Sequence, residues 1–402
     1  MASAGERAPR HCMIVHSQYP LGETRVQREA GALVDAGFQV EVICLREEAE
    51  AFTEVVDQVR VHRMPVRRHR GSTMWAQLLE YLAFLILAGL FVGWRHLRRR
   101  FDVVQVHNLP DALVFAAVIP KMMGAKVILD LHDLMPEFYA ARVGSSMTGS
   151  MVRVVRLQER VSCAFADLVI TVTDRWRQTL ADRGVPKEKS AVVMNLADPA
   201  VFVRSTRYEH DDGFTVIYHG TFTERYGVDL LVEAARRLVG RVQGLRVDLL
   251  GEGEQRARLV DLVAEFRLED VVRISPTMIS AEELPPIISR ADVGVVPNRS
   301  NVFTEGILPT KLLEYVAMGT PVVASRTSGV TEYFDDSMVC FFAPGNADDL
   351  ADRLLFLANH PEERSRLAGE ADRFNLEHSW EKTALDYVSL VSSLAGPGRE
   401  KH

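Results

Sequence analysis

The residues whose types and spacing best suit chemistry lie in the segment 301–325, NVFTEGILPTKLLEYVAMGTPVVAS. Pro309 suits the first position of a helix, so the N–H groups of Thr310 and Lys311 would point out of that helix end. Such an end attracts anions, and Lys311 adds a full positive charge. Glu314 lies one turn further along the same face, where its carboxylate can accept two sugar hydroxyls. This spacing favours a nucleotide sugar; the alternative is an exposed salt bridge between Lys311 and Glu314.

Polar residues also follow the apolar, strand-like runs of the sequence. In open parallel sheets, ligands bind beyond the carboxyl ends of the strands, where loops and helix N-termini converge. The residues at these positions are His16-Ser17, His107-Asn108, His132-Asp133 and Thr173-Asp174 in the first half, and His219-Gly220, Gly251-Glu252-Gly253 and Pro297-Asn298 in the second. No complete G-x-G-x-x-G follows a strand and there is no Walker A motif, which disfavours a dehydrogenase and a P-loop NTPase.

The elements that would position these residues alternate regularly along the chain. Strands are predicted at 12–17, 39–45, 59–64, 101–107, 126–132, 167–173, 190–195, 214–220, 245–254, 271–275, 291–297, 320–325 and 338–343. Helices are predicted from residue 26 and at 81–94, 111–123, 150–165, 174–184, 227–238, 283–289, 308–318 and 347–394. This alternation indicates an α/β fold of βαβ units with parallel sheets.

The polar, aperiodic segment 196–212 interrupts this alternation and is interpreted as an interdomain linker. We therefore expect an N-terminal domain over 1–198 and a second domain over 199–378. A C-terminal helix over 379–402 is expected to pack back on the N-terminal domain.

The chain of 402 residues is 47% hydrophobic and has a formal net charge of −7, which suits a globular protein of two domains. The charge is uneven, with +3 on the first 200 residues and −10 on the rest. Between residues 60 and 100, nine arginines accompany a single acid, Glu80. An acidic chain is not a dedicated nucleic-acid binder, and its basic stretch suggests an anionic surface or substrate.

Within this basic stretch, the apolar run 81–94 has 14 residues, whereas a spanning helix needs about 20. It is either a buried core helix or a helix that dips into one leaflet while arginines hold anionic headgroups. The four cysteines form no C-x-x-C pair, so we expect buried thiols and neither a disulfide framework nor a zinc site. Since no signal-peptide pattern is present, we expect a cytoplasmic protein or one peripheral on the inner face of the cell membrane.

The segment 312–325, LLEYVAMGTPVVAS, resembles the nucleotide-binding segment of retaining glycosyltransferases of family 4. The family pattern is a glutamate, seven residues, a second glutamate and then small-Gly-x-Pro-Val-Val. Glu314 matches the second glutamate, whereas Gly306 stands at the position of the first. Either Glu305 serves with a shift of one residue, or the chain belongs to a branch in which PTKLLEY replaces the standard form.

A second motif extends the resemblance into the segment YHGTFTERYGVDLL. The family has Gly-Arg-x-x-x-x-Lys-Gly there, and its two cations hold the diphosphate. Thr221 stands at the arginine position and Tyr226 at the lysine position, so Arg225 is expected to replace the missing cation. The resemblance implies a donor-binding set made of Gly220, Thr221, Arg225, Gly251, Gly253, Thr310, Lys311 and Glu314.

The motifs HNLPDALVF and ILDLHDLMPE resemble the strand-end motifs of the family's acceptor domain. The resemblance places His132 beside the donor sugar at the reaction centre. The acceptor side would then be formed by His16, His107, Asn108 and Asp133, and the catalytic group by His132, Arg225, Lys311 and Glu305.

The resemblance implies the GT-B fold, in which two Rossmann-like, doubly wound parallel-sheet domains face each other across a cleft. It implies retaining transfer of a hexose or derivative from a UDP- or GDP-linked sugar, without a metal or other cofactor. The acceptor would be a saccharide or polyprenyl-linked saccharide of a bacterial cell-surface polysaccharide or glycoconjugate. The alternatives are a GT-B phosphorylase, a nucleotide-sugar epimerase, or a non-catalytic adaptor that binds nucleotide sugar or an anionic membrane; no nucleic-acid partner is expected.

Overall fold

The computed structural model describes residues 7–20, 23–47, 50–67, 74–204 and 213–396. Its chain divides into two compact units. The first unit comprises residues 1–195 and 381–402, and the second comprises residues 196–380. Each unit is built on its own sheet, so each is described separately.

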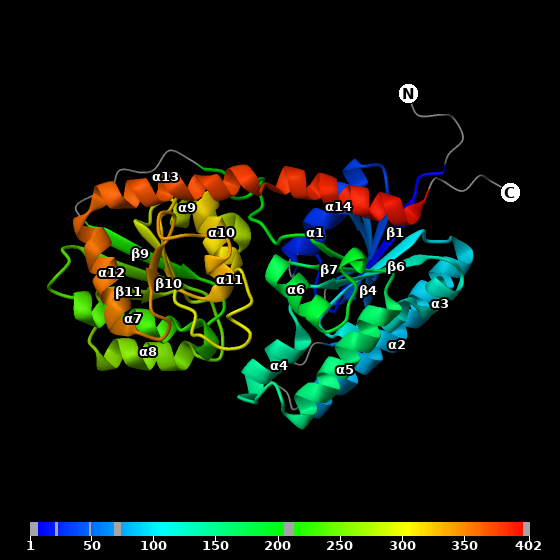
Figure 1. The fold of residues 1–402 in the computed structure, drawn as a ribbon, viewed down its shortest axis with the longest axis horizontal. Coiled ribbons are helices and arrows are strands. Elements are labelled where there is room, and N and C mark those ends of the chain that lie inside the picture. The colour runs from blue at the N-terminus through cyan, green and yellow to red at the C-terminus, as the bar shows by residue number, and fades with distance from the viewer. Residues whose placement is uncertain (1–6, 21–22, 48–49, 68–73, 205–212, 397–402) are drawn as a thin grey trace. The chain divides into compact units, whose positions relative to one another are not determined.

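The first unit contains an eight-stranded sheet in the order β3-β4-β2-β1-β5-β6-β7-β8. Figure 1 labels β1, β4, β6 and β7 among these strands. Neighbouring strands are parallel except β3 and β4, which form an antiparallel pair at one edge. The strands are β1 Arg10–Ile14, β2 Gln39–Leu45, β3 Thr53–Val56, β4 Val59–Met64, β5 Val103–His107, β6 Lys126–Leu131, β7 Leu168–Thr171 and β8 Ser190–Val192. The sequence analysis missed β3, because its residues are all exposed or half-buried and form no apolar run.

The helices of the first unit are α1 Thr24–Asp35, α2 Met74–Arg98, α3 Val118–Met122, α4 Met135–Val143, α5 Ser150–Phe165, α6 Asp174–Asp182 and α14 Trp380–Ala395, with 3₁₀ turns η1 Asp111–Ala117 and η2 Lys187–Lys189. The single helix predicted over 111–123 is wrong. Pro120 has no N–H for the carbonyl of Ala116, so a continuous α-helix is broken there, and a 3₁₀ turn precedes the short α3. Tyr387 and Val391 of α14 are fully buried in the core of this unit, together with Val26 and Leu33 of α1.

The helix α2 differs most from the sequence expectation, because it has 25 residues and much of its surface is exposed. By length and composition it could cross a membrane, and only 28% of its most apolar stretch is buried. One face, with Phe84, Ala88 and Val92, is fully buried. The opposite face is apolar and exposed, so the interpretation of this segment as a buried core helix is wrong.

The second unit contains a six-stranded, all-parallel sheet in the order β11-β10-β9-β12-β13-β14. The strands are β9 Phe214–His219, β10 Leu245–Leu250, β11 Val272–Ile274, β12 Val293–Val296, β13 Val322–Ser325 and β14 Cys340–Phe342. The helices are α7 Val228–Leu238, α8 Arg256–Glu265, α9 Leu284–Ile288, α10 Thr310–Ala317, α11 Ser328–Thr331, α12 Ala347–Asn359 and α13 Pro361–Glu377, with 3₁₀ turns η3 Glu224–Tyr226 and η4 Ala281–Glu283. The core forms where apolar faces of α7, α8 and α12 pack with the sheet. Both units are thus Rossmann-like.

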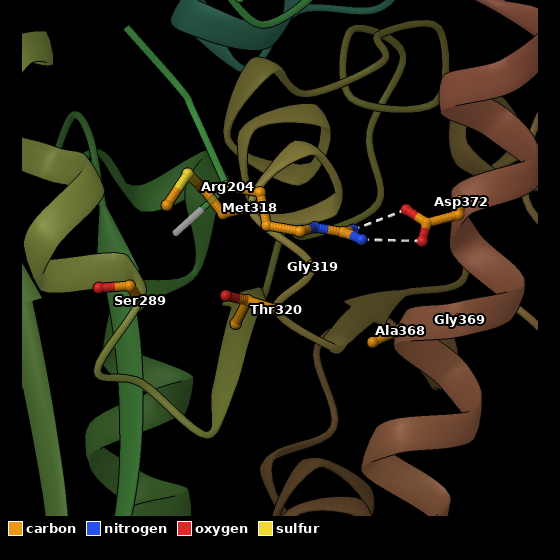
Figure 2. Close-up of a pocket in the computed structure, with 8 residues that line it drawn as sticks. All are labelled: Arg204, Ser289, Met318, Gly319, Thr320, Ala368, Gly369 and Asp372. Carbon is orange, nitrogen blue, oxygen red and sulfur yellow. Dashed lines mark hydrogen bonds and ion pairs between the residues drawn. The ribbon is translucent and has the colours of Figure 1, made fainter. Parts of the chain in front are cut away.

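Gly319, in the motif that follows α10, has a structural role that Figure 2 shows. Its φ is +70°, a left-handed conformation that glycine adopts without strain. A Cβ at this position would come within 2.6 Å of the Arg204 guanidinium, which forms a bidentate ion pair with Asp372 of α13 at 2.6 and 2.9 Å. The three residues line a cavity of 210 Å³. The glycine therefore lets Arg204 reach across the end of α10 to α13.

Replacing Gly319 with alanine should lower the free energy of unfolding of the second unit by about 1–3 kcal/mol, since it adds a strained φ and displaces Arg204. The matched control is Gly345→Ala, because Gly345 has a similar φ of +79° and open space around its Cβ position. Urea denaturation followed by circular dichroism measures both variants. Equal destabilisation by the two substitutions would show that the contact with Arg204 contributes nothing.

Candidate active site

The second unit has a pocket of 290 Å³ at the carboxyl ends of β9 and β10 and the N-terminus of α10. Five of the residues predicted to bind the donor line it, namely Gly220, Thr221, Thr310, Lys311 and Glu314. The other lining residues are His219, Tyr226, Leu250, Met278, Ile279, Ala281 and Leu284. Most of these were missed, because the loop that carries Met278 and Ile279 has no charged or glycine-rich signal.

The helix α10 begins at Thr310, and not at Pro309 as predicted. Pro309 is extended, with φ −65° and ψ 127°, and its carbonyl accepts the first helical hydrogen bond from Leu312 N–H at 3.0 Å. The N–H groups of Thr310 and Lys311 therefore precede the first hydrogen-bonded turn, at the positive end of the helix. The helix thus starts one residue later than predicted, and the N–H groups at its start belong to the two residues expected, Thr310 and Lys311.

Lys311 is a buried cation at this helix end, with 9% of its surface exposed. Its Nζ lies 4.8 Å from the centre of the Tyr226 ring and 5.1 Å from that of Tyr218. Gly220 has φ +119°, and a Cβ there would lie 3.2 Å from the Lys311 Cε, so the glycine leaves room for the ammonium group. Burial lowers the pKa of Lys311 to about 8, although Glu314 raises it in part. This charge is short of water and is well placed to bind an anion.

Glu314 faces the same pocket from the next turn of α10. Its Oε2 lies 3.2 Å from Nε2 of His219. Burial, and then the charge of Lys311, lower the pKa of His219 to about 3, so its ring is neutral at physiological pH. Next to Glu314, the Tyr315 hydroxyl accepts a hydrogen bond from the backbone N–H of His219 at 3.2 Å. The same hydroxyl donates to the backbone carbonyl of Ile217 at 3.3 Å. These bonds fix α10 against β9 and thereby place Lys311 and Glu314.

Gly251 and Gly253 act on the shape of the loops rather than on the pocket surface. A Cβ at Gly251 would lie 1.9 Å from the carbonyl oxygen of Gly220, and one at Gly253 would lie 2.3 Å from that of Phe222. The backbone N–H of Phe222 donates to the Glu252 carbonyl at 2.7 Å. The loop after β10 is therefore packed directly on the loop after β9, which carries Thr221.

Arg225, expected as a replacement cation, lies next to the pocket. Its guanidinium carbon is 5.1 Å from the centre of the Tyr226 ring and 5.6 Å from that of Phe303. The ring of Tyr226 lines the pocket, and Arg225 does not. In this structure Lys311 is therefore the cation that the pocket presents.

Glu305 is not among the residues that line the pocket, and it joins two loops. Its Oε2 accepts hydrogen bonds from the N–H and hydroxyl of Ser328 at 2.8 and 2.7 Å, at the start of α11. Its Oε1 accepts the Ser300 hydroxyl at 2.6 Å. The structure thus places Glu305 where it orients the segment that leads into α10.

The first unit has a second polar cluster, at the carboxyl ends of β5 and β6. Nδ1 of His107 lies 3.1 Å from Nε2 of His132 and 3.2 Å from Oδ2 of Asp130. Burial lowers the pKa of His107 to about 4. Although burial opposes its charged form, Asp130 raises the pKa of His132 above the ordinary value. His132 is also the more exposed ring, with 19% of its side chain accessible, so it is the member that can meet a substrate.

Asp130 is held by a buried network that the sequence analysis missed. The Arg25 guanidinium donates to its Oδ1 at 3.0 Å, and the amide of Gln105 donates to its Oδ2 at 3.1 Å. Despite burial, Arg25 and then His132 hold the pKa of Asp130 well below its usual range. The hydroxyl of Tyr387, on α14, donates to Gln105 Oε1 at 2.7 Å. The C-terminal helix is thus connected to the carboxylate that orients His132.

His107, Asp130 and His132 also place ligand atoms within 4.8 Å of one another, a spacing that could hold a metal ion. The charge of Asp130 is already balanced by Arg25 at 3.0 Å. A divalent cation at this point would meet the guanidinium at close range. The cluster is therefore better suited to orient the His132 ring and to favour its protonated form than to bind a metal ion.

The remaining acceptor-side residues take different places. Asn108 donates to the Asp133 carbonyl at 2.6 Å, and its Oδ1 accepts the His132 N–H at 2.8 Å, so it fixes the backbone that carries His132. Asp133 contributes its backbone to this arrangement. His16 is buried against α2, where its Nε2 lies 3.2 Å from Oε1 of Glu80.

The sequence matches two glycosyltransferase domain families in succession. Residues 22–195 match the glycosyl transferase 4-like domain, and residues 204–374 match the glycosyl transferases group 1 family. With a Rossmann-like unit underlying each match, the chain belongs to the GT-B glycosyltransferases.

Among its relatives is WcaL of Escherichia coli (strain K12), a putative colanic acid biosynthesis glycosyltransferase. It is 28% identical over 94% of this chain and 98% of that protein. The amylovoran biosynthesis glycosyltransferase AmsK of Erwinia amylovora is 29% identical over 51% of this chain and 49% of that protein.

Among solved structures, sucrose-phosphate synthase from Thermosynechococcus elongatus aligns with a TM-score of 0.78 at 20% identity, over 96% of this chain and 99% of that one. HepE of Anabaena, in complex with UDP-glucose, aligns with a TM-score of 0.71 at 15% identity, again over 96% and 99%. These structures establish the GT-B fold.

Replacing Tyr387 with phenylalanine should lower the free energy of unfolding by about 1–2 kcal/mol, because Gln105 loses a buried hydrogen-bond donor. The matched control is Tyr139→Phe, which removes a hydroxyl from a half-buried tyrosine in the same unit. Urea denaturation followed by circular dichroism compares the two. If both substitutions were neutral, the network would not depend on α14.

Proposed function

We propose that this protein is a retaining glycosyltransferase that transfers a hexose or a derivative from a nucleotide-diphosphate sugar. The observation that carries the proposal is the pocket at the start of α10, where a buried cation, a helix N-terminus and a carboxylate meet. HepE, which shares the fold, was solved with UDP-glucose, and starch synthase IV from Arabidopsis thaliana, another structural neighbour, with ADP. The nucleotides bound to these neighbours support a nucleotide ligand for the corresponding unit of this chain.

The donor would bind in a defined orientation. Its diphosphate would contact the Lys311 ammonium, which is positively charged. It would also accept hydrogen bonds from the backbone N–H groups of Thr310 and Lys311, which have no partner within the helix. Its ribose hydroxyls would donate to Glu314, whose carboxylate can only accept. The apolar wall with Met278 and Ile279 would contact the base of a UDP- or GDP-linked sugar.

Catalysis would rest on stabilising charge that grows on the leaving diphosphate. Retention implies that the acceptor attacks from the face that the diphosphate leaves, and that a phosphate oxygen takes the acceptor proton. Lys311 and the helix N-terminus are preorganised for this charge, and loss of one such group costs about 2–4 kcal/mol of barrier. Arg225 would assist from beside Tyr226, and His132 would contact the transferred sugar. No step in this scheme calls for a metal ion.

The acceptor would be a saccharide or a lipid-linked saccharide. The relatives WcaL and AmsK are named for the biosynthesis of colanic acid and amylovoran, so we infer a role in bacterial cell-surface polysaccharide synthesis at the cytoplasmic side of the membrane.

A nucleoside diphosphate should raise the melting temperature selectively. At 100 times its dissociation constant a ligand adds about 2.7 kcal/mol of stability. Differential scanning fluorimetry across UDP, GDP, ADP and their sugars, at a fixed pH of 7, identifies the base. Lys311→Met and Glu314→Gln should lose the shift, whereas Lys187→Met, at an exposed turn of the first unit, should keep it. A chain that shows no shift with any nucleotide would contradict the donor site, and binding without sugar transfer would favour the adaptor.

The affinity for the diphosphate should fall as the pH rises through 8. The pKa of Lys311 is about 8 in the free protein, so above that pH the lysine is mostly neutral and must take up a proton on binding. The dissociation constant should then rise up to about tenfold per pH unit until the pKa of the complex is reached.

Isothermal titration calorimetry between pH 6.5 and 9.5 measures this dependence (a range of about three units around the expected midpoint). Lys311→Arg is the matched variant, because arginine stays charged throughout the range and should flatten the profile. An unchanged slope in this variant would assign the proton to another group.

A further inference from the structure

The helix α2 presents two faces of different character. Glu80, Phe84, Ala88, Val92 and His96 recur at helical spacing and are buried. The helix packs on η1 and α3. Two polar side chains of the helix, those of Glu80 and His96, are thus buried, whereas the polar residues of an ordinary surface helix face the solvent.

The outward face of α2 is almost entirely apolar. Its large exposed side chains are Trp75, Leu78, Leu79, Leu82, Ile86, Leu87, Leu90, Trp94 and Leu97, and the exposed fractions of Trp75 and Leu79 are 71% and 66%. The sequence of α2 contains one acid, Glu80, which faces inward. A contiguous apolar face of this kind on a helix is a docking surface rather than a solvated one.

The neighbouring edge of the sheet extends this surface. Phe52, 43% exposed, contacts the ring of Phe91 with centroids 5.8 Å apart, and Phe91 in turn lies 5.8 Å from Trp94. Val55 of β3, three residues further along the chain, is also exposed. The apolar surface of α2 therefore extends to Phe52, the residue that precedes β3.

The charge around this surface is positive. Arg98, Arg99 and Arg100 are exposed at the end of α2, and the Arg98 guanidinium lies 4.1 Å from the centre of the Trp94 ring. Tryptophan at a helix end with arginine beside it is the arrangement that the interface of a bilayer favours. Arg67 is also exposed, ahead of the helix.

We propose that the exposed face of α2, with Phe52, docks in the plane of a bilayer that contains anionic lipids. A spanning orientation is disfavoured because it would remove Phe84, Ala88 and Val92 from the core of the first unit. A second copy of the chain is disfavoured because arginines flank the helix on both sides, so either orientation of a helix pair would bring like charges together. Anionic headgroups balance that charge.

The proposed docking face is connected to the acceptor-side residues of the first unit. The pair of Glu80 with His16 connects the buried face of α2 to the loop after β1. If the acceptor is lipid-linked, which rests on the proposed function, this face would hold the first unit where such an acceptor is anchored. The surface itself does not depend on the donor chemistry.

Flotation of the full-length protein with vesicles tests this proposal. The protein should float with vesicles of 70% phosphatidylcholine and 30% phosphatidylglycerol (roughly the anionic content that a polybasic surface responds to) and remain behind with pure phosphatidylcholine at moderate salt. Leu82→Asp and Leu90→Asp should each lower the partition coefficient about tenfold or more. Arg98→Gln and Arg99→Gln should each lower it about fivefold, since each arginine contributes about 1 kcal/mol.

The matched control is Leu376→Asp, which places the same charge on α13 of the second unit at a residue 85% exposed. It should float like the native chain. Nucleotide-induced thermal stabilisation, measured on every variant, separates failure of this surface from failure of the donor site. Three results would overturn the proposal: native chain that does not float, bound chain that resists carbonate extraction as an integral protein does, and α2-dependent dimers by light scattering without vesicles.

Discussion

A lysine ammonium held out of water at the positive end of a helix is the physical constraint on which the pocket of the second unit depends. Burying such a charge is costly unless it is compensated. Lys311 is compensated in part, by the faces of two tyrosine rings and by Glu314. Its pKa of about 8, against 10.5 for an ordinary lysine, corresponds to about 3 kcal/mol of remaining penalty for the charged form. An anionic ligand beside the ammonium would offset this penalty, which is the physical basis of the proposed donor site.

Several features of the unit serve to keep that ammonium in place. The Tyr315 hydroxyl fixes α10 to β9, and Gly294 makes room for it, because a Cβ there would lie 2.4 Å from the tyrosine ring. Gly220 makes room for the lysine itself. The first unit also holds a buried charge in place, in this case the Asp130 carboxylate. Arg25 and Gln105 fix this carboxylate, and it raises the pKa of His132.

The fold could be predicted from the sequence because apolar runs of parallel strands are buried on both faces and are bounded by turns. The spacing in PTKLLEY also predicted that Lys311 and Glu314 share one face of a helix, and both line the same pocket. Asp130, Gln105 and Tyr387 could not be found in this way. The first two lie inside apolar strands, and Tyr387 comes from a helix more than 250 residues away in sequence, so only the folded chain brings them together.

The same limit explains α2. The run 81–94 predicted a helix, but composition does not tell which face of that helix is covered. The helix has 25 residues, and it buries Glu80 and His96 while most of its large apolar side chains stay exposed. The hydrogen bonds of Glu305 to Ser328 and Ser300 likewise could not be predicted from its spacing. Partnerships across loops are set by tertiary packing and leave no periodic signal in the sequence.

The most direct test of the central claim is a crystal structure of the chain with the nucleoside diphosphate that stabilises it most. We predict diphosphate oxygens within hydrogen-bond distance of the Lys311 ammonium and the Thr310 N–H group, with ribose hydroxyls on Glu314. A nucleotide whose diphosphate lies away from the start of α10 would contradict the account.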